Sequence, residues 1–494
     1  MSRSTIASTV GIVCLLANPV AGLAGWWTWS PDVLTPHFAY QDPGSGDILH
    51  SSCNSNGSAA FLSDKPNKFP LKAQPKPATP LAVTGWWDDD LNTPIASIFY
   101  QGTDDSIVNA FFTCDNKTGN YKLDPEGIDI VSDLAGAPSV HEKTGLAVTE
   151  LGDSGGYRLY YHDEDGLVNL MAYDDDTDWR YDGPVSLKKT AGKAIAALQI
   201  KGTNVSVAYP YDSNNIAVAH FNQDNKNKWS LESFPTPFDS PTPTNNTDPS
   251  DVRLDTSGDS SLKLSSFDNA AVNLGIAAGA KQQLSILYIG KDAQLHAVSS
   301  DGGAWKEEES PGSKEWPEAD DASGRLAVVS PLDSSDIWVY YMSGDKVLEL
   351  YRDESGSWAK AKTPSSTTKN DDSKSDNESD GSDDSTGTDG SSDAKTSESA
   401  AASPATGMTT GAKAGIGVGV GVGVLALLAA VFFFLRKRRQ TLGPGQRKDS
   451  VGELGSGASY RAVEMPTEIH EPQELAATQN QKYELLGDTG HRVS

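Results

Sequence analysis

Short runs of alternating apolar and polar positions fill the chain from residue 25 to residue 360. The apolar positions are mostly β-branched or aromatic, and Gly, Asp and Asn separate one run from the next. No long stretch repeats its apolar residues at the helical spacing of three or four. This pattern is typical of short strands joined by tight turns, so the region is predicted to be all-β.

A repeated pair of apolar residues divides this region into six units. In five units an aliphatic residue follows a Tyr seven positions later, across a polar turn, and in the first unit it follows eight positions later. Each pair predicts a hairpin. A single unit of about four strands cannot bury both of its faces, whereas a closed ring of six units can, so we predict a six-bladed β-propeller, with a pair of β-sandwiches as the alternative. The pairs are Tyr40/Ile48, Tyr100/Ile107, Tyr161/Val168, Tyr209/Ile216, Tyr288/Leu295 and Tyr341/Leu348.

Tryptophan residues mark further positions in the units. Trp26-Trp27 and Trp86-Trp87 each follow a Gly and precede the marker Tyr of the first two units. Neighbouring side chains of a strand point to opposite faces, so one Trp of each pair is expected to be buried. A later Trp follows the marker in the last four units. Its regular spacing favours packing between blades, with stacking on a sugar ring as the alternative role. These residues are Trp179, Trp229, Trp305 and Trp358.

Each unit thus reads as an aliphatic-aromatic pair, a polar turn with Asp and Gly, an aliphatic residue and then a Trp. This repeat pattern resembles that of the blades of the fungal fucose-specific lectins of the Aleuria type, over about residues 25–360. The resemblance implies a six-bladed propeller that binds carbohydrate without catalysis. It also implies a sugar site in each unit, built from an Arg just before the paired aromatics, a Glu twelve residues later and a stacking aromatic.

Every unit departs from that site pattern. Only Arg158 keeps the Arg, and none of the units keeps the Glu. Arg158, with Trp179, Trp229, Trp305 and Trp358 as stacking candidates, is therefore the remaining carbohydrate-binding set that the resemblance implies. The Arg positions hold His37, Ser97, Arg158, Ser206, Ser285 and Trp338. The Glu positions hold His50, Asn109, Leu170, Val218, Ala297 and Leu350. The first of them lies thirteen residues after His37, because the first unit has one extra residue.

The two ends of the propeller region adjoin segments of another kind. Residues 1–24 carry one early charge, an apolar stretch and small residues, which predicts a cleaved secretory signal peptide. Residues 361–410 are mostly Ser, Thr, Asp, Lys, Asn and Gly, which predicts a disordered stalk that holds the propeller away from its anchor.

An apolar stretch follows the stalk. Residues 412–435 are long enough to cross a bilayer as one transmembrane α-helix, and the basic residues 436–439 mark its cytoplasmic end. Residues 436–494 are predicted to be a disordered cytoplasmic tail. Gly415, Gly419 and Gly423 repeat at a spacing of four, which predicts a homodimer face, with a generic glycine-rich span as the alternative.

N-glycosylation sequons support this topology, because all of them precede the apolar stretch and acceptors need exposure to the lumen. The chain is thus predicted to be a single-pass type I protein of the plasma membrane or cell surface, with its N-terminus outside. The acceptors are Asn56, Asn116, Asn204, Asn245 and Asn377.

Composition and charge exclude several functions. A net charge of −27 offers no basic face for nucleic acid. No metal-ligand cluster or cofactor motif is present, and acidic turns such as 174–178 do not fit the EF-hand spacing. The arginines are scattered, which argues against a sialidase, so no enzyme is predicted. Cys53 and Cys114 hold similar places in the first two units and are expected to form a disulfide.

The sequence therefore predicts a membrane glycoprotein that displays a lectin-like propeller and recognises glycans or cell-wall polymers. The alternative is a structural or sensor surface protein that binds a protein or wall partner without sugar specificity.

Overall fold

The computed structural model describes residues 22–366, apart from residues 30–32, 153–154, 224–228, 240–241, 259–261, 271, 280–282, 301–303 and 323. The predicted transmembrane helix with its glycine face, the cytoplasmic tail, Asn377 and most of the signal peptide and stalk lie outside the described residues. Within the described part of the chain, no helix is long and apolar enough to cross a membrane.

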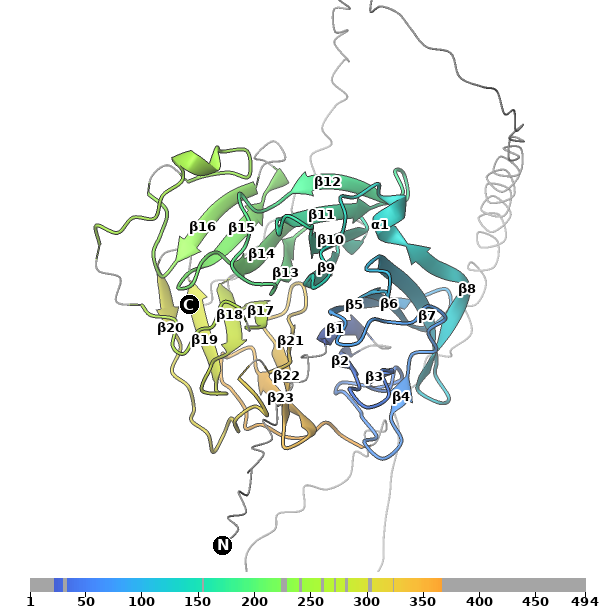
Figure 1. Ribbon diagram of the computed structural model, residues 1–494. Helices are drawn as coiled ribbons and strands as arrows, with labels where there is room; N and C mark the ends of the chain where they lie inside the picture. Colours follow the sequence, from blue (N-terminus) through green and yellow to red (C-terminus); the bar gives the residue numbers. More distant parts are fainter. Residues whose placement is uncertain are drawn as a thin grey trace, which may run out of the picture. The chain divides into compact units, whose positions relative to one another are not determined.

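Six antiparallel sheets follow one another along the chain as the blades of a propeller (Figure 1). The strands of blade 1 are β1 (Leu23–Trp29), β2 (Leu34–Gln41), β3 (Ile48–His50) and β4 (Asn67–Lys68). Blade 2 contains β5 (Leu81–Asp88), β6 (Thr93–Gln101), β7 (Ile107–Asp115) and β8 (Asn120–Ile130), followed by the short helix α1 (Val131–Leu134). Blade 3 contains β9 (Leu146–Glu150), β10 (Tyr157–His162), β11 (Val168–Tyr173) and β12 (Arg180–Pro184).

The second half of the ring repeats this order. Blade 4 contains β13 (Ala196–Lys201), β14 (Asn204–Pro210), β15 (Ile216–Phe221) and β16 (Trp229–Phe234), followed by the 3₁₀ helix η3 (Pro249–Asp251). Blade 5 contains β17 (Leu274–Ala278), β18 (Leu284–Ile289), β19 (Leu295–Ser300) and β20 (Trp305–Glu307). Blade 6 contains β21 (Leu326–Val329), β22 (Ile337–Ser343) and β23 (Lys346–Arg352).

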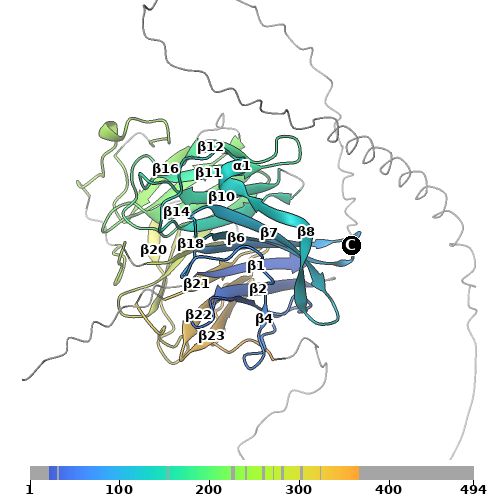
Figure 2. The ribbon, with the colours of Figure 1, turned by 45° about the vertical axis from the view of Figure 1, so that its right-hand side comes forward.

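The ring closes between the last blade and the first. The first strand of each blade lies beside the first strand of the next, and β21 lies beside β1 (Figure 2). The outer edge of blade 6 is formed by isolated bridges, Arg352 with Trp358 and Glu349 with Lys362. Beyond them, the backbone N–H of Phe61 in blade 1 donates to the carbonyl of Ser365 at 2.7 Å. The predicted six-bladed all-β propeller is confirmed.

The marker pairs lie where the repeat placed them, on the hairpin between the second and third strands. In blade 3, for example, His162 pairs with Val168 across the turn. Blade 6 has a tighter turn, in which Ser343 pairs with Lys346 across Gly344 and Asp345 at φ +60° and +59°. These angles fit a two-residue type I′ turn. We call the face that carries these six hairpins the hairpin face, and the other the opposite face.

The start of each inner strand carries a further pattern, which lies outside the repeated Tyr and Trp positions. An aliphatic residue, a small residue and a third residue recur in Leu23-Ala24-Gly25, Leu146-Ala147-Val148 and Leu326-Ala327-Val328, and the other blades hold close variants. The small residue is needed where strands converge on the axis. A Cβ added to Gly275 of β17 would lie 2.1 Å from Val328 Cγ2.

The propeller begins and ends slightly beyond residues 25–360. Leu23 and Ala24 belong to β1, pair with Tyr40 and Ala39, and are 8% and 6% exposed. Residues 361–366 continue the outer edge of blade 6. Residues assigned from composition to the signal peptide and the stalk thus belong to the folded ring, because pairing and burial set a domain boundary more closely than composition does.

The core lies between adjacent blades and is rich in aromatic side chains. Trp179, Trp229 and Trp305 are each less than a tenth exposed, whereas Trp358 is half-buried. Trp305 stacks on Phe234 with ring centroids 4.0 Å apart. Burial of rings of this size is a main source of stability in such a fold. In β1, Trp26 is buried and Trp27 is partly exposed, as the alternation of side chains predicts. In β5, Trp86 and Trp87 are both partly exposed, so the expected burial of one Trp is wrong for the second pair.

Blades 1 and 2 are also joined covalently. Cys53 and Cys114 form a disulfide with their Cα atoms 5.7 Å apart. Both cysteines belong to the core cluster between these two blades.

Candidate functional site

A cavity of about 490 Å³ lies between blades 3 and 4, on the opposite face. It brings together Arg158 and Trp229, two of the five carbohydrate-binding candidates. The other lining residues extend from an apolar floor to a charged and polar rim. They are Tyr160, Leu170, Arg180, Asp182, Thr203, Val205, Phe221 and Gln223.

The floor of the cavity is fixed by strand register. Tyr160 stands directly across from Leu170, on the face of β10 and β11 that packs toward blade 4. The Trp229 ring meets Tyr160 edge to face at 6.0 Å and lies 5.4 Å from the half-buried Phe221. Aromatic rings held this way present apolar surface to the C–H face of a sugar.

Arg158 is anchored at the wall of the cavity. Its Nη1 donates to the carbonyl oxygens of Gly155 and Tyr157, each at 2.8 Å. The side chain is half-buried, and this burial lowers the pKa of Arg158, although an arginine stays charged at any physiological pH. The backbone contacts hold the guanidinium plane in place, which prepares it to bind an oxygen acceptor.

A carboxylate reaches the same cavity from a strand that the repeat did not single out. A β-bulge in the pairing of β11 with β12 places Leu170 across from Gly183 and Met171 across from Tyr181. Asp182 is the extra residue between these partners, and its side chain lines the cavity beside Leu170. The cavity therefore contains an Arg and a carboxylate, although the counted Glu position, Leu170, is apolar.

Arg180 holds that carboxylate and an acidic turn together. Its Nε donates to Asp182 Oδ1 at 3.0 Å and its Nη1 donates to Asp174 Oδ2 at 2.6 Å. The hydrogen bond from Arg180, and after it the one from the Thr177 hydroxyl, lower the pKa of Asp174 to about 2. The acidic turn is thus occupied by an arginine, and no cluster that would hold a metal ion occurs among the described residues.

The remaining candidates lie apart from this cavity. Trp179 packs between blades 2 and 3, where its ring stacks on Tyr157 at 6.0 Å. Trp305 lies between blades 4 and 5, and Trp358 lies under the guanidinium of Arg352 at 5.7 Å. Arg180, Asp182 and Phe221 were missed by the sequence. The sequence offers one indication, for Arg180 alone, which directly follows the candidate Trp179.

Register also corrects the Glu position of blade 6. Counting twelve residues from Trp338 gives Leu350, yet Trp338 stands across from Tyr351, so Glu349 is the residue on the Trp338 face. The tight Gly344-Asp345 turn removes one residue and shifts the count. Glu349 is 2% exposed, accepts from the Tyr340 hydroxyl at 2.9 Å and pairs with Lys362 at 3.3 Å. It is closed to a ligand and holds the blade edge.

Blade 1 replaces both charged positions with buried histidines. His37 and His50 are fully buried, and Trp26 stacks on His37 at 5.3 Å. Burial, and to a lesser extent the neighbouring His50, lowers the pKa of His37 to about 3. Burial lowers the pKa of His50 to about 4, against two backbone hydrogen bonds that raise it. Both rings are neutral at physiological pH and serve as core.

Blade 4 carries a chain of side chains that invites comparison with a hydrolase. Ser206 Oγ lies 2.9 Å from His220 Nδ1, and His220 Nε2 lies 3.2 Å from Glu232 Oε1. A cleft of about 810 Å³ opens beside His220 and Glu232. Ser206, however, is 2% exposed and does not line the cleft, so a substrate carbonyl has no path to its hydroxyl.

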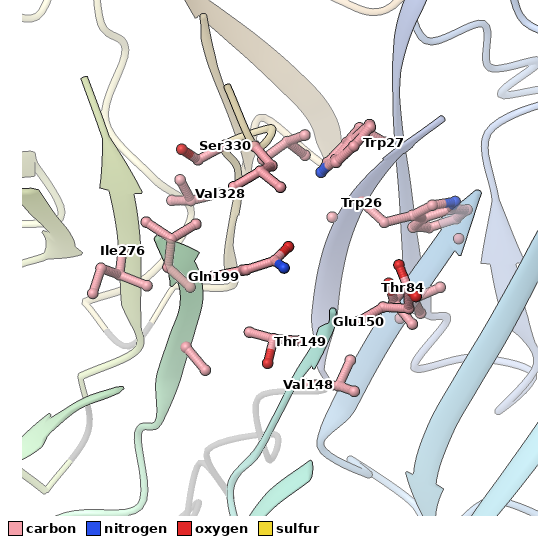
Figure 3. Close-up of a pocket in the computed structure, with 17 residues that line it drawn as sticks. Trp26, Trp27, Thr84, Val148, Thr149, Glu150, Gln199, Ile276, Val328 and Ser330 are labelled. Carbon is pink, nitrogen blue, oxygen red and sulfur yellow. The ribbon is translucent and has the colours of Figure 1, made fainter. Parts of the chain in front are cut away.

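At the opposite face, the axial channel is too narrow to hold a sugar. Its opposite-face end is a space of about 100 Å³ enclosed by all six inner strands (Figure 3). Gln199 and Thr149 reach toward the centre of this space, and Trp27 and Ser330 lie at its edge. The cavity between blades 3 and 4 is therefore the better candidate.

Several solved lectin structures align with most of this chain at low sequence identity. A fungal lectin from Aleuria aurantia, described as a six-bladed β-propeller with a novel fucose recognition mode, is 14% identical, covers 72% of this chain and 98% of its own, with a TM-score of 0.48. A variant of that lectin in complex with α-methyl-L-fucoside is 14% identical, covers 72% and 97%, and has a TM-score of 0.49. A lectin from Burkholderia pseudomallei is 13% identical, covers 70% and 99%, and has a TM-score of 0.40.

No protein-family model matches the sequence, and no curated protein matches it. The chain contains a six-bladed β-propeller, a class defined by its six sheets and the closure of the ring.

Proposed function

We propose that the propeller binds a glycan in the cavity between blades 3 and 4, without catalysis. The observation that carries this proposal is the meeting of Arg158, Asp182 and the aromatic pair of Phe221 and Trp229 in one cavity. A guanidinium donates to sugar oxygens, a carboxylate accepts from hydroxyls, and aromatic rings cover the C–H face.

The preference for fucose is expected to be looser than in a site with a Glu at the counted position. Leu170 there offers no acceptor, and Asp182 enters from a different strand. Binding to a single cavity of this kind is expected to be weak. Display of many copies on one surface would raise the apparent affinity by avidity.

A glycan array tests the proposal with a secreted protein that ends at residue 366, because the ring closes within residues 22–366. Fucosylated, galactosylated and mannosylated glycans and wall polymers should be included. Arg158→Gln is expected to weaken binding at least tenfold, and Phe221→Ala to weaken it severalfold. Arg253→Gln, at an exposed arginine of the insertion after β16, is the matched control. The absence of any bound glycan would remove the proposal.

We further propose that the chain is a type I surface protein anchored by residues 412–435. The support is in the sequence, which has an apolar stretch of bilayer length, basic residues directly after it and sequons before it. Protease added to intact cells should remove the propeller and leave a membrane fragment with the tail. A propeller that survives, or a chain recovered from cytosol, would contradict this topology.

The competing function is a surface protein whose propeller binds a protein or wall partner without sugar specificity. The array separates the two functions, since a protein partner would be captured equally well by the Arg158→Gln variant and in the presence of free sugars.

A further inference from the structure

A second cavity, of about 620 Å³, lies at the hairpin-face mouth of the axial channel. Its charged lining residues are Lys76, Lys143, Lys193 and Arg325, against a single carboxylate, Glu142. This cluster of cations is unexpected in a chain with a net charge of −27.

The fold itself brings these cations together. Arg325 directly precedes Leu326, the first residue of β21. Lys193 and Lys143 each stand three residues before the first residue of their inner strands, Ala196 of β13 and Leu146 of β9. The inner strands all start at this mouth, so residues far apart in the sequence meet around the axis. The cations gather at this mouth because each of them precedes an inner strand and all inner strands start there.

Two of the cations are held by the protein and two are not. Lys76 pairs with Asp105 and donates to the carbonyl of Glu142 at 2.6 Å, and Arg325 Nη1 donates to the carbonyl of Gln41 at 3.2 Å. Lys143 is exposed, and no ion pair involves it among the described residues.

Lys193 is the unusual member. Its Nζ is covered, and within the described part of the chain it has no hydrogen-bond partner. Burial lowers the pKa of Lys193, Lys189 lowers it further, and Asp163 partly offsets both. Asp163 is occupied, because its carboxylate accepts from the Leu167 N–H at 2.9 Å and from Asn169 Nδ2 at 2.8 Å. Burial of an unpaired ammonium costs free energy of folding, and the Lys193 ammonium lacks a counter-charge.

We propose that the hairpin-face mouth of the channel is an anion site that binds an oxyanion group, a carboxylate, sulfate or phosphate, through Lys193 and Lys143. The group can belong to a free inorganic anion or to an acidic saccharide such as a uronate. This site is on the other side of the ring from the proposed glycan cavity and does not depend on it.

Titration calorimetry of the secreted protein tests the proposal at constant ionic strength, because screening by salt would otherwise mimic competition. The probes are sodium sulfate, galacturonate and, as its neutral match, galactose. Sulfate or galacturonate should bind and galactose should not bind at this mouth. Binding of sulfate alone would assign the site to free anions, and binding of galacturonate to acidic sugars. Lack of binding by both anions would overturn the proposal.

Two variants locate the site. Lys193→Met and Lys143→Met should each weaken anion binding at least tenfold, while Lys306→Met, at an exposed lysine of β20, should leave it unchanged. Lys193→Met should also raise the melting temperature in chloride, because it removes an unpaired charge. This second measurement tests the role of Lys193 even if the Lys143→Met variant folds poorly. Unchanged binding in both variants would contradict the assignment. Arg158→Gln should retain anion binding, which separates this result from the glycan proposal.

Discussion

The Tyr340 hydroxyl donates to the carboxylate of Glu349 across the β22–β23 pair at 2.9 Å, inside the space between blades 6 and 1. Both residues are almost fully buried. Lys362 reaches the same carboxylate at 3.3 Å from the outer edge of blade 6. The Glu349 carboxylate, through its ion pair with Lys362, therefore links the β22–β23 hairpin to the segment that closes the ring against blade 1.

Glu349→Ala should destabilise the propeller by about 2–3 kcal/mol, because the buried Tyr340 hydroxyl loses its acceptor. Urea unfolding measures the change, with Glu354→Ala, at an exposed glutamate of the same region, as the control. The double variant Tyr340→Phe with Glu349→Leu should recover part of the loss. A double variant less stable than the sum of its single changes would argue against a direct pairing.

Loss of the disulfide should destabilise the propeller by about 4 kcal/mol, since the bridge closes a loop of 61 residues in the unfolded chain. The Cys53→Ser, Cys114→Ser double variant tests this by urea unfolding. The wild-type protein under reducing conditions provides a comparison without substitution. Equal unfolding midpoints for oxidised and reduced wild-type protein would show that the bridge adds no stability.

Stability should fall as the pH drops below 6.5. Burial holds the pKa of His37 near 3 and that of His50 near 4, so below pH 6.5 the unfolded chain takes up protons that the folded chain does not. Above pH 6.5 both states are neutral at these sites and the effect vanishes. By pH 5 each histidine should cost about 2 kcal/mol. Asp174, with a pKa near 2, acts only below about pH 4.

Urea unfolding between pH 7.5 and 5.0 measures this slope. His37→Gln should reduce the slope, because it removes one of the two buried histidines. A stability that stays constant from pH 7.5 to 5.0 would contradict the burial of neutral histidines.

The mature chain should begin at or before Gly22. Leu23 and Ala24 are buried in β1, and the Gly22 N–H donates to the carbonyl of Thr79 at 3.0 Å. Cleavage after residue 24 would remove part of the inner strand of blade 1. N-terminal sequencing of the secreted protein decides between the two positions, and a start at Gly25 would show that blade 1 tolerates a shortened β1.

The sequence by itself determined the all-β class, the six units and the hairpin in each, because the side-chain period of a strand and the chemistry of tight turns are local. It also selected Arg158 as the single retained position. Only the tertiary structure decided which side chains share a cavity. Register and closure determine the bulge that brings Asp182 beside Leu170 and the turn that moves Glu349 into the place counted for Leu350. They also determine the mouth that Lys143 and Lys193 both line. Those are contacts between distant segments, and residue spacing along one chain does not encode them.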